Sequence, residues 1–306
     1  MIKDRFGRPI TSLRISLTQK CNLECFYCHR EGENKENDDE MTSEEIAKIV
    51  EIASHFGISK VKLTGGEPLL RKDIFDIISK IRSIKGIVEV SMTTNGTLLA
   101  EKAKKLREVG LSRVNVNFPS RKRDVYKAIT RRDYVKNVEE GINEAYKVGL
   151  NPVKVNMVVL KSLNDEEIWD MINYLADKDL TLQLIELEKL GNVKEEIYNK
   201  YFFDLDKIEK KLLNDSFKVE VKNLQNRKIY YLKSGGRIEL VRPFHNSEFC
   251  MNCTRIRITS DGKIKPCLMK MNNHVDILSS IRTNASDNEL HKIFLKAIML
   301  REPFFR

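Results

Sequence analysis

Short apolar runs rich in β-branched residues alternate with longer amphipathic runs through the first two thirds of the chain. Apolar positions at a helical period predict a helix, and a short, continuous apolar run predicts a buried strand. Thr42 and Glu45 form a capping pair at the start of the first amphipathic run, which favours a helix there. The predicted strands are residues 13–17, 61–63, 88–92, 114–118, 153–160 and 182–187, and the predicted helices are residues 42–56, 73–84, 99–109, 134–148 and 165–176.

The alternation of strands and helices sets the fold class. Six strands with helices between them predict an α/β fold with a parallel sheet and right-handed crossovers. An incomplete barrel and an open doubly wound sheet both fit this number of strands. Beyond residue 191 the alternation ends, and the sequence predicts a helix, three short strands and a hairpin that turns at Asp261 and Gly262. These elements are residues 203–213, 219–221, 229–232, 238–241, 256–259 and 264–267.

The six cysteines of the chain fall into two triplets, spaced C-x3-C-x2-C and C-x2-C-x13-C. An iron–sulfur cube with four irons normally takes four thiolates, so that three leave one iron free for a substrate or a second cofactor. Two such triplets favour an enzyme with two open-cornered clusters. A zinc site is the alternative, and a disulfide framework is disfavoured in a chain of this length. The triplets are Cys21, Cys25 and Cys28, and Cys250, Cys253 and Cys267.

Unusual residues follow the ends of four predicted strands. The first cysteine triplet follows the first strand, and a Gly-Gly-Glu-Pro motif at residues 65–68 follows the second. A Thr-Thr-Asn-Gly motif at residues 93–96 follows the third strand, and Asn117 ends the fourth. Because chemistry in parallel α/β barrels occurs at the carboxyl ends of the strands, we expect these residues to share one site.

Three cations interrupt predicted strands. Arg14, Lys62 and Lys154 each lie between two apolar residues, and side chains alternate along a strand. Since helices cover the outside of a barrel, these three side chains are expected to point inward. Buried cations are costly unless anions neutralise them, and a triphosphate would do so. The alternative for any one of them is that it snorkels to solvent or pairs with Glu186.

The 306 residues carry a formal net charge of +10. Lysines are interspersed with acids and no basic stripe carries aromatic residues, so we expect no nucleic-acid partner. The richness in Lys, Glu and Ile is also typical of thermophile surfaces, which would explain the charge without a partner. The absence of a signal-like start and of a long apolar run, together with clustered thiolates, predicts a cytoplasmic protein without a membrane partner. Residues 31–40 are charged and poor in apolar side chains, which predicts a mobile loop.

The first triplet, with the Gly-Gly-Glu-Pro motif downstream, resembles the radical S-adenosylmethionine (SAM) superfamily. The resemblance implies a cluster whose open iron is chelated by the amino and carboxylate groups of SAM. In that family an electron from the cluster cleaves the sulfonium and gives methionine and a 5′-deoxyadenosyl radical. The resemblance also implies SAM contacts at Tyr27, Gly66 and Asn117.

The second triplet and the run Cys-Thr-Arg-Ile-Arg at residues 253–257 resemble the GTP 3′,8-cyclase family of molybdenum cofactor biosynthesis, along nearly the whole chain from Asp4 onward. In that family the second cluster binds the guanine of GTP, and the product is (8S)-3′,8-cyclo-7,8-dihydroguanosine 5′-triphosphate. The resemblance implies a partial (β/α)6 TIM-like barrel over residues 1–200 and a C-terminal region, residues 201–306, that carries the second [4Fe-4S] cluster and closes the barrel. The implied substrate contacts are Arg14, Lys62, Thr93, Lys154, Arg255 and Arg257.

Three positions depart from the pattern of that family. Asn117 opens an Asn-Phe-Pro run where the family commonly has Ser-Leu-Asp, and Gln183 stands where an arginine is expected. Glu188 replaces a methionine near SAM, and it is an expected SAM contact. The alternatives are a radical SAM enzyme that modifies a peptide or protein with an auxiliary cluster, and a non-catalytic iron–sulfur or zinc protein. The arginines beside the second triplet and the interior cations favour GTP over a peptide.

The resemblance also implies partners. They are a ferredoxin- or flavodoxin-like reductant and the downstream cyclic pyranopterin monophosphate synthase, and a homodimer is compatible with the sequence.

Overall fold

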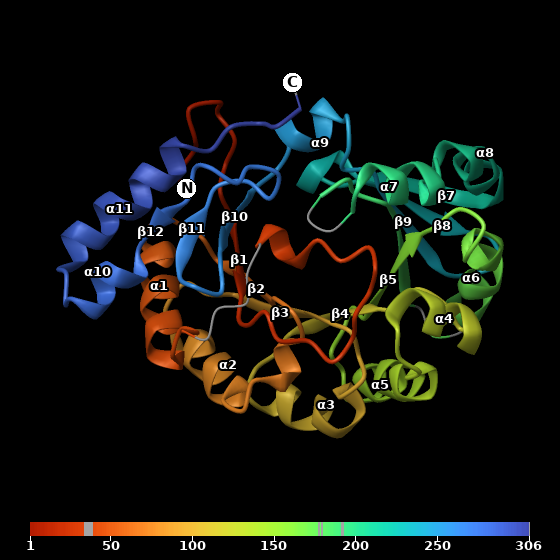
Figure 1. Ribbon diagram of the computed structural model, residues 1–306, viewed down its shortest axis with the longest axis horizontal. Helices are drawn as coiled ribbons and strands as arrows, with labels where there is room; N and C mark the ends of the chain where they lie inside the picture. The colour runs from red at the N-terminus through yellow and green to blue at the C-terminus, as the bar shows by residue number, and fades with distance from the viewer. Residues whose placement is uncertain (34–38, 177, 179, 191–192, 306) are drawn as a thin grey trace.

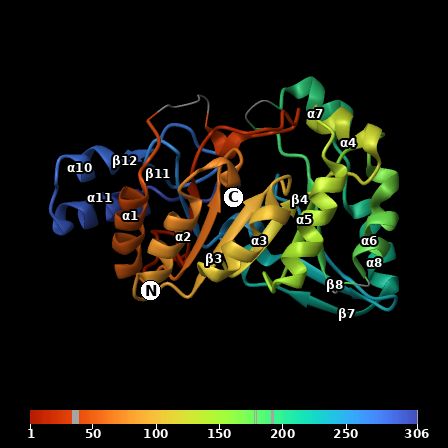
Figure 2. The same ribbon diagram turned by 90° about the horizontal axis from the view of Figure 1, so that it is seen from below.

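The computed structural model describes residues 1–33, 39–176, 178, 180–190 and 193–305 of the chain. The strands form one sheet in the order β12-β11-β10-β1-β2-β3-β4-β5-β6-β9-β8-β7. Strands β1 to β6 are parallel, and their connecting helices lie outside the curved sheet (Figures 1 and 2). The predicted α/β fold with a partial (β/α)6 barrel is therefore confirmed. The strands are β1 Ser12–Ser16, β2 Lys60–Thr64, β3 Glu89–Thr94, β4 Arg113–Asn117, β5 Lys154–Val159, β6 Thr181–Glu186, β7 Ser216–Val221, β8 Lys228–Leu232, β9 Arg237–Val241, β10 Arg255–Ile258, β11 Lys263–Lys265 and β12 Val275–Asp276.

The helices predicted between the six strands are present. Thr42 and Glu45 form the capping box expected at the start of α1. The sequence did not predict α4, α7, α9, α10 or α11. The helices are α1 Ser43–His55, α2 Ile74–Ser83, α3 Leu99–Glu108, α4 Arg123–Thr130, α5 Val135–Lys147, α6 Ile168–Ala176, α7 Glu195–Tyr201, α8 Asp206–Asp215, α9 Ser247–Met251, α10 Leu278–Arg282 and α11 Asp287–Met299.

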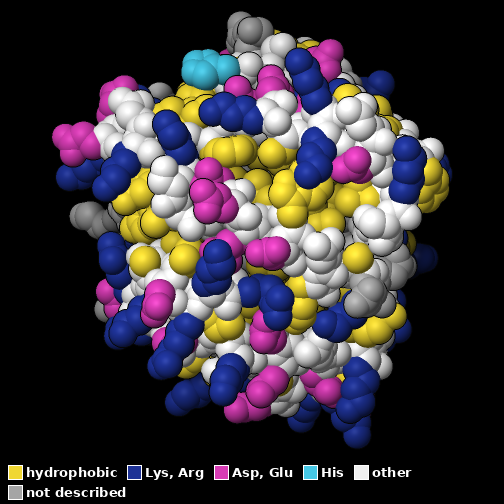
Figure 3. All heavy atoms as spheres, turned by 90° about the vertical axis from the view of Figure 1, so that its right-hand side faces the viewer, with side chains coloured by type: hydrophobic (Ala, Val, Ile, Leu, Met, Phe, Trp, Pro, Cys, Tyr) yellow, Lys and Arg dark blue, Asp and Glu magenta, His cyan; other side chains and the backbone are white. Residues whose placement is uncertain are grey.

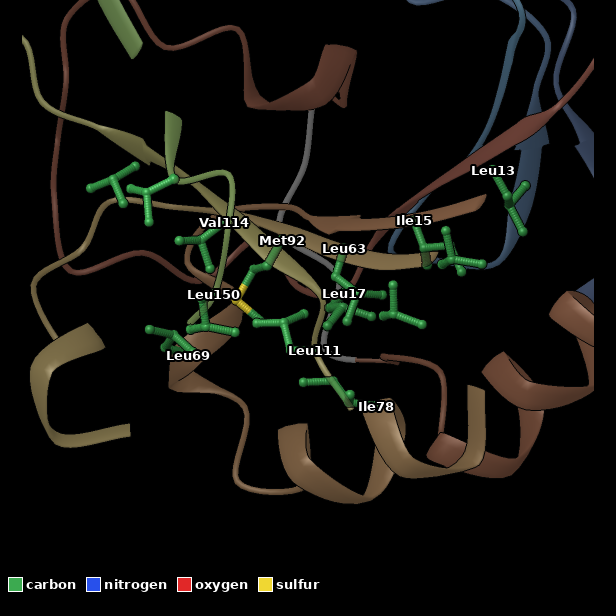
Figure 4. Packing of buried hydrophobic residues seen from close by; sticks show 14 of the residues in the cluster. Leu13, Ile15, Leu17, Leu63, Leu69, Ile78, Met92, Leu111, Val114 and Leu150 are labelled. Carbon is green, nitrogen blue, oxygen red and sulfur yellow. The ribbon is translucent and has the colours of Figure 1, made fainter. Parts of the chain in front are cut away.

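The main hydrophobic core lies between the sheet and the helices around it. Leu13 and Ile15 from β1, Leu63 from β2 and Met92 from β3 are buried on this side, near Ile78 of α2 (Figure 4). Because side chains alternate along a strand, the residues between these positions face the inside of the barrel. The apolar outer layer therefore fixes which polar side chains enter the barrel.

The C-terminal strands continue the sheet at both of its edges. Strand β10 pairs in parallel with β1, and β9 pairs in parallel with β6. The antiparallel neighbours of these two strands, β11 and β8, extend each edge further (Figure 1). One sheet thus runs through both regions of the chain, and the division near residue 200 stays a prediction.

The exterior is highly charged. On the face shown in Figure 3, Lys and Arg side chains are interspersed with Asp and Glu. Within the described part of the chain, no helix combines the length and the apolar character that crossing a membrane requires.

Candidate active site

One cavity of about 390 Å³ collects the residues singled out in the sequence. It lies at the carboxyl ends of the barrel strands and extends to the C-terminal strands β9 and β10. Volumes of this order are typical of small-molecule sites. All the expected site residues line it: Arg14, Cys21, Cys25, Tyr27, Cys28, Lys62, Gly66, Thr93, Asn117, Lys154, Glu188, Cys250, Cys253, Arg255, Arg257 and Cys267.

The loop after β1 presents the first cysteine triplet to this cavity. A turn closed by the Cys28 N–H on the Cys25 carbonyl (3.0 Å) brings two of the thiols to the same side. The Cys21 sulfur accepts hydrogen bonds from the Leu23 N–H (3.4 Å) and the Asn95 amide (3.9 Å). Burial has the largest effect and raises the pKa of the Cys21 thiol, whereas these N–H donors favour its thiolate, which is the ligand form in an iron–sulfur cluster. The donor set of the first triplet therefore fits a cluster.

The Gly-Gly-Glu-Pro motif packs against the backbone that precedes Cys21. A Cβ on Gly66 would lie 2.2 Å from the Lys20 carbonyl oxygen, so no larger residue fits without moving this segment. The Gly66 N–H donates to the Thr18 carbonyl (2.7 Å), and the Glu67 N–H donates to the Lys20 carbonyl (2.8 Å). The glycine thus permits a close approach between two segments of the protein itself, which the sequence did not reveal.

Glu67 has a structural position in this motif. Its carboxylate is fully buried and accepts hydrogen bonds from the Thr94 hydroxyl and the Asn95 N–H, both at 2.7 Å, and from the Leu69 N–H at 3.0 Å. Glu67 therefore ties the end of β2 to the end of β3. Since Asn95 also reaches the Cys21 sulfur, this network positions the first triplet.

Tyr27, Asn117 and Gly66 lie around the loop of the first triplet, whereas Glu188 lines the cavity where its charge acts on Arg14. The Asn117 amide donates to the Tyr27 hydroxyl oxygen (3.0 Å), which joins the cysteine loop to the end of β4. One carboxylate oxygen of Glu188 is buried without a hydrogen-bond partner among the described residues. A buried carboxylate oxygen of this kind needs a donor, and the amino group of a bound ligand would supply one. Thr93 lines the same cavity from β3.

Arg14 and Arg257 share a carboxylate that the sequence did not assign to the site. Glu31 contacts a guanidinium nitrogen of each arginine at 2.9 Å and accepts from the Thr64 hydroxyl at 2.9 Å. Burial opposes the charged form, but the two arginines outweigh it and lower the pKa of Glu31 to about 2. Residues 34–38 of the predicted mobile loop lie outside the described residues, whereas Glu31 is buried and paired, contrary to that prediction.

Replacing Glu31 by Gln is expected to lower the free energy of unfolding near pH 7 by about 3 kcal/mol, since each unit of pKa shift corresponds to about 1.4 kcal/mol. The folded carboxyl has the lower pKa, so its contribution is complete above the unfolded pKa and decreases as the pH falls toward 2. Anaerobic urea unfolding of both proteins at several pH values would measure this. The difference between the two free energies of unfolding should be constant near neutral pH and should become smaller below about pH 4.5.

Glu24→Gln is the matched control, because Glu24 lies in the same loop with an exposed side chain that pairs with Arg132 at 2.6 Å. Exposed pairs contribute less than about 1 kcal/mol. A Glu31→Gln effect that does not change with pH would contradict an ionised, paired carboxylate.

The other interior cations meet neutral partners or a second buried carboxylate. Lys62 donates to the amide oxygen of Asn115 (2.8 Å), and burial together with Arg113 and Arg14 lowers its pKa. The Asn115 amide nitrogen in turn donates to Gln183 (2.7 Å). Arg14, Lys62 and Lys154 all line the cavity, so the alternation along the strands placed them correctly.

Glu239 on β9 forms ion pairs with three cations in the cavity. It contacts the ammonium groups of Lys154 at 2.5 Å and Lys222 at 3.0 Å, and the guanidinium of Arg227 at 3.0 Å. Lys154 therefore does not pair with Glu186, the partner considered from the sequence. Sequence reasoning missed Glu239, Lys222 and Arg227, although a glutamate between apolar residues of a short strand is itself a signal of an inward-facing carboxylate.

The second cysteine triplet is assembled by the C-terminal hairpin. Cys250 lies in α9, and the Cys253 N–H donates to its carbonyl (3.2 Å). Strands β10 and β11 pair antiparallel after a turn in which Gly262 has a φ of 73°, as the Asp-Gly pair predicted. This hairpin returns the chain so that Cys267 lines the same cavity as Cys253. None of these three described thiols forms a disulfide.

Arginines surround the second triplet. Burial and the neighbouring cations Arg227 and Arg14 lower the pKa of Arg255, whereas Cys253 opposes this shift. Burial disfavours the Cys253 thiolate, but the charges of Arg301 and Arg255 outweigh it and lower the pKa of that thiol. The donor set and the positive surroundings fit a cluster with anionic ligands.

The geometry also bears on the zinc alternative. Among the described residues, no group of three His, Cys, Asp or Glu side chains converges on one ion position. A cubane takes its thiolates on different irons and therefore needs sulfurs that surround a larger volume. Each triplet offers three free thiols that line the cavity, which is the donor set of an open-cornered cluster.

The chain matches the radical SAM superfamily over residues 15–175 and the Molybdenum Cofactor Synthesis C family over residues 180–305. It is 49% identical to a probable GTP 3′,8-cyclase of Thermococcus kodakarensis, with all of both chains covered. It is 46% identical to a probable GTP 3′,8-cyclase of Pyrococcus horikoshii, covering 100% of this chain and 98% of that one. The corresponding protein of Methanocaldococcus jannaschii is 45% identical over 100% of this chain and 99% of its own.

Solved structures share the fold. SuiB of Streptococcus suis, bound to S-adenosylmethionine, matches with a TM-score of 0.68 and 17% identity, over 89% of this chain and 64% of that one. The enzyme anSMEcpe with bound AdoMet matches with a TM-score of 0.60 and 19% identity, over 88% of this chain and 74% of that one. At such identities the likeness establishes the fold alone. The family matches and the full-length relatives show that this chain belongs to the radical SAM superfamily and, within it, to the GTP 3′,8-cyclase family.

Proposed function

We propose that this protein cyclises GTP to (8S)-3′,8-cyclo-7,8-dihydroguanosine 5′-triphosphate, the first step of molybdenum cofactor biosynthesis. The observation that carries the proposal is that two cysteine triplets and a layer of interior cations line one cavity. The full-length relatives are named probable GTP 3′,8-cyclases, which supports the same activity. Neither the described lining of the cavity nor the names of the full-length relatives favour a peptide substrate.

The two triplets would hold the two [4Fe-4S] clusters. When bound, the cluster on the first triplet supplies the electron that cleaves SAM and starts the radical reaction. Glu188 has a buried oxygen without a partner among the described residues, which would accept a hydrogen bond from SAM, and Tyr27, Asn117 and Gly66 would complete that pocket. The chain would orient the reactants and exclude water from them.

The cations would hold the nucleotide. Arg14, Lys62 and Lys154 would neutralise the triphosphate. Lys62 meets a neutral amide, and Arg14 and Lys154 each share one carboxylate with further cations, so that a net positive charge remains inside the barrel. Arg255 and Arg257 would orient the base and ribose beside the second triplet, and Thr93 would contact the nucleotide from β3. These contacts would hold GTP between the two triplets, as the reaction requires.

Lys222 and Arg227 are expected to add to the phosphate contacts at the position where Gln183 lacks a charge. Replacing either by Met should raise the KM for GTP about tenfold to a hundredfold, since a hydrogen bond to a charged group contributes about 1.5–3 kcal/mol. Product formation over a range of GTP concentrations would measure this.

Lys233→Met provides the control, since Lys233 donates to the carbonyl of Asn214 on an exposed turn. Wild-type KM values in both cavity variants would remove Lys222 and Arg227 from the substrate site.

An anaerobic turnover assay tests the proposed function. The protein is reconstituted with iron and sulfide, supplied with SAM, GTP and a strong reductant, and its products are analysed by mass spectrometry. GTP-dependent 5′-deoxyadenosine together with a cyclised isomer of GTP is the expected result. Cleavage of SAM with GTP unchanged would contradict the proposed substrate, and intact SAM in fully clustered protein would contradict the radical reaction.

The cellular setting belongs to the same proposal. Oxygen-sensitive clusters need a reducing compartment, which supports a cytoplasmic location. A ferredoxin- or flavodoxin-like protein would supply the electron, and cyclic pyranopterin monophosphate synthase would take the product. A homodimer is compatible with this arrangement.

A further inference from the structure

The two ends of the chain meet beside the second cysteine triplet. Asp4 and Arg8 belong to the N-terminal turn, and Arg301 lies in the tail after α11, which passes this turn near α9 (Figure 1). The exposed fractions of these residues are 5%, 4% and 1%, so all three are buried. One oxygen of Asp4 contacts both guanidinium groups, at 2.9 Å from Arg8 Nε and 2.7 Å from Arg301 Nη1. We call these three residues the terminal triad.

The terminal triad has a fixed geometry and a net charge. The other oxygen of Asp4 accepts hydrogen bonds from the N–H groups of Phe6 (3.0 Å) and Arg8 (3.1 Å), so the carboxylate cannot rotate away. Two guanidinium groups and one carboxylate leave a buried charge of about +1. A buried net charge is unfavourable unless an anion lies nearby. The triad therefore needs negative charge in its surroundings.

The two arginines hold the backbone that carries the second triplet. Arg8 Nη1 donates to the carbonyl of Cys250 (2.9 Å), and Arg301 donates to the carbonyls of Arg255 (2.9 Å) and Cys253. Both arginines line the cavity. The remaining Nη of Arg8 is buried and has no hydrogen-bond partner in the described part of the chain. Glu302, the next residue after Arg301, pairs with Arg5 and Lys270, whereas the charge of Arg301 acts on the Cys253 thiol and favours its thiolate.

We propose that the terminal triad is a positioning device for the second cluster: it fixes residues 250–255 and, through its positive charge, raises the reduction potential of that cluster. The inference rests on the proposed assignment of the second cluster to Cys250, Cys253 and Cys267. Reduction adds negative charge to a cluster, so a nearby positive charge favours the reduced state. Groups that hold the ligands and tune the charge around a metal site control its properties in this way.

Substitutions of opposite charge give opposite predictions. Arg301→Gln and Arg8→Gln each remove one positive charge and should lower the reduction potential of the second cluster. Asp4→Asn removes the negative charge at almost constant shape and should raise it. A triad that only braces the fold would give shifts that do not follow charge. Arg301→Lys keeps the charge and should stay near the wild-type potential.

The experiment is an anaerobic redox titration of the full-length protein with both clusters, followed by electron paramagnetic resonance. A Cys21→Ser variant assigns each signal to its triplet. Arg5→Gln is the control, since Arg5 lies in the same segment with a side chain 51% exposed, and it should change neither potential. The potential of the first cluster should stay constant in all these variants.

Three outcomes decide the inference. Shifts of opposite sign for Asp4→Asn and for the arginine variants support it, and Arg8→Gln alone carries the test if Arg301→Gln does not fold. Equal potentials in all variants, or shifts that do not follow charge, with the second cluster intact by iron content, overturn it and leave the proposed function in place. Iron for only one cluster in the wild-type protein would overturn both.

Discussion

GTP cyclisation is expected to be lost when Cys267 is replaced by serine, while part of the SAM cleavage persists. A serine hydroxyl is a much weaker iron ligand than a thiolate, and Cys267 supplies one of only three ligands in its triplet. Replacing a group that only supports a metal ligand lowers metal affinity or activity about tenfold to a hundredfold. Replacing the ligand itself should therefore lower the rate of GTP cyclisation more than about a hundredfold. The first triplet lies on a separate loop and keeps its own donors.

Mass spectrometry of both products measures this separation, with cyclised GTP and 5′-deoxyadenosine quantified in the same reaction. Cys28→Ser is the matched variant, because the same substitution in the first triplet should abolish both products. If Cys267→Ser lost both activities with the first cluster intact, the division of roles between the triplets would be wrong.

Gly66→Ala is expected to destabilise the protein by about 3 kcal/mol or more and to empty the first triplet of iron. The added Cβ would lie 2.2 Å from the Lys20 carbonyl oxygen and 2.8 Å from that of Gln19. Both neighbours are backbone atoms, so that relief requires moving the segment that leads into Cys21. Overpacking of an adaptable core costs about 1–3 kcal/mol, and this contact is less adaptable.

Urea unfolding and the iron content after reconstitution would report the two effects. Gly149→Ala is the control, since Gly149 has a φ of 78° but no atom within 4 Å of the added Cβ. Gly149→Ala should lower the free energy of unfolding only by the backbone strain, about 1–2 kcal/mol, and the protein should bind as much iron as the wild type. Normal iron and stability in Gly66→Ala would mean that the loop before Cys21 adapts freely.

The elements that the sequence predicted correctly are those governed by local rules. Side chains alternate along each strand, and the apolar ones face outward toward the helices. The alternation therefore places Arg14, Lys62 and Lys154 inside the barrel. The Asp-Gly turn and the spacing of the second triplet likewise follow from short stretches of sequence.

The site residues that the sequence did not predict depend on pairings between segments that are far apart in the chain. Glu239 becomes a cavity residue only because β9 pairs with β6, which aligns it with Gln183. Glu31 lies in a stretch whose composition resembles a solvated loop, yet two arginines from different strands bury it. Composition alone cannot distinguish a charged residue that is solvated from one that is neutralised inside the fold.

The pairing of β1 with β10 has a consequence for synthesis of the chain. Ser12 of β1 pairs with Arg255 of β10, so β1 is synthesised long before its outer partner. Until then the barrel exposes an unpaired edge of a parallel sheet, which favours association with other chains. Contacts between segments so far apart in the chain also form slowly. The nascent protein therefore passes through a long interval in which a molecular chaperone would be of most use.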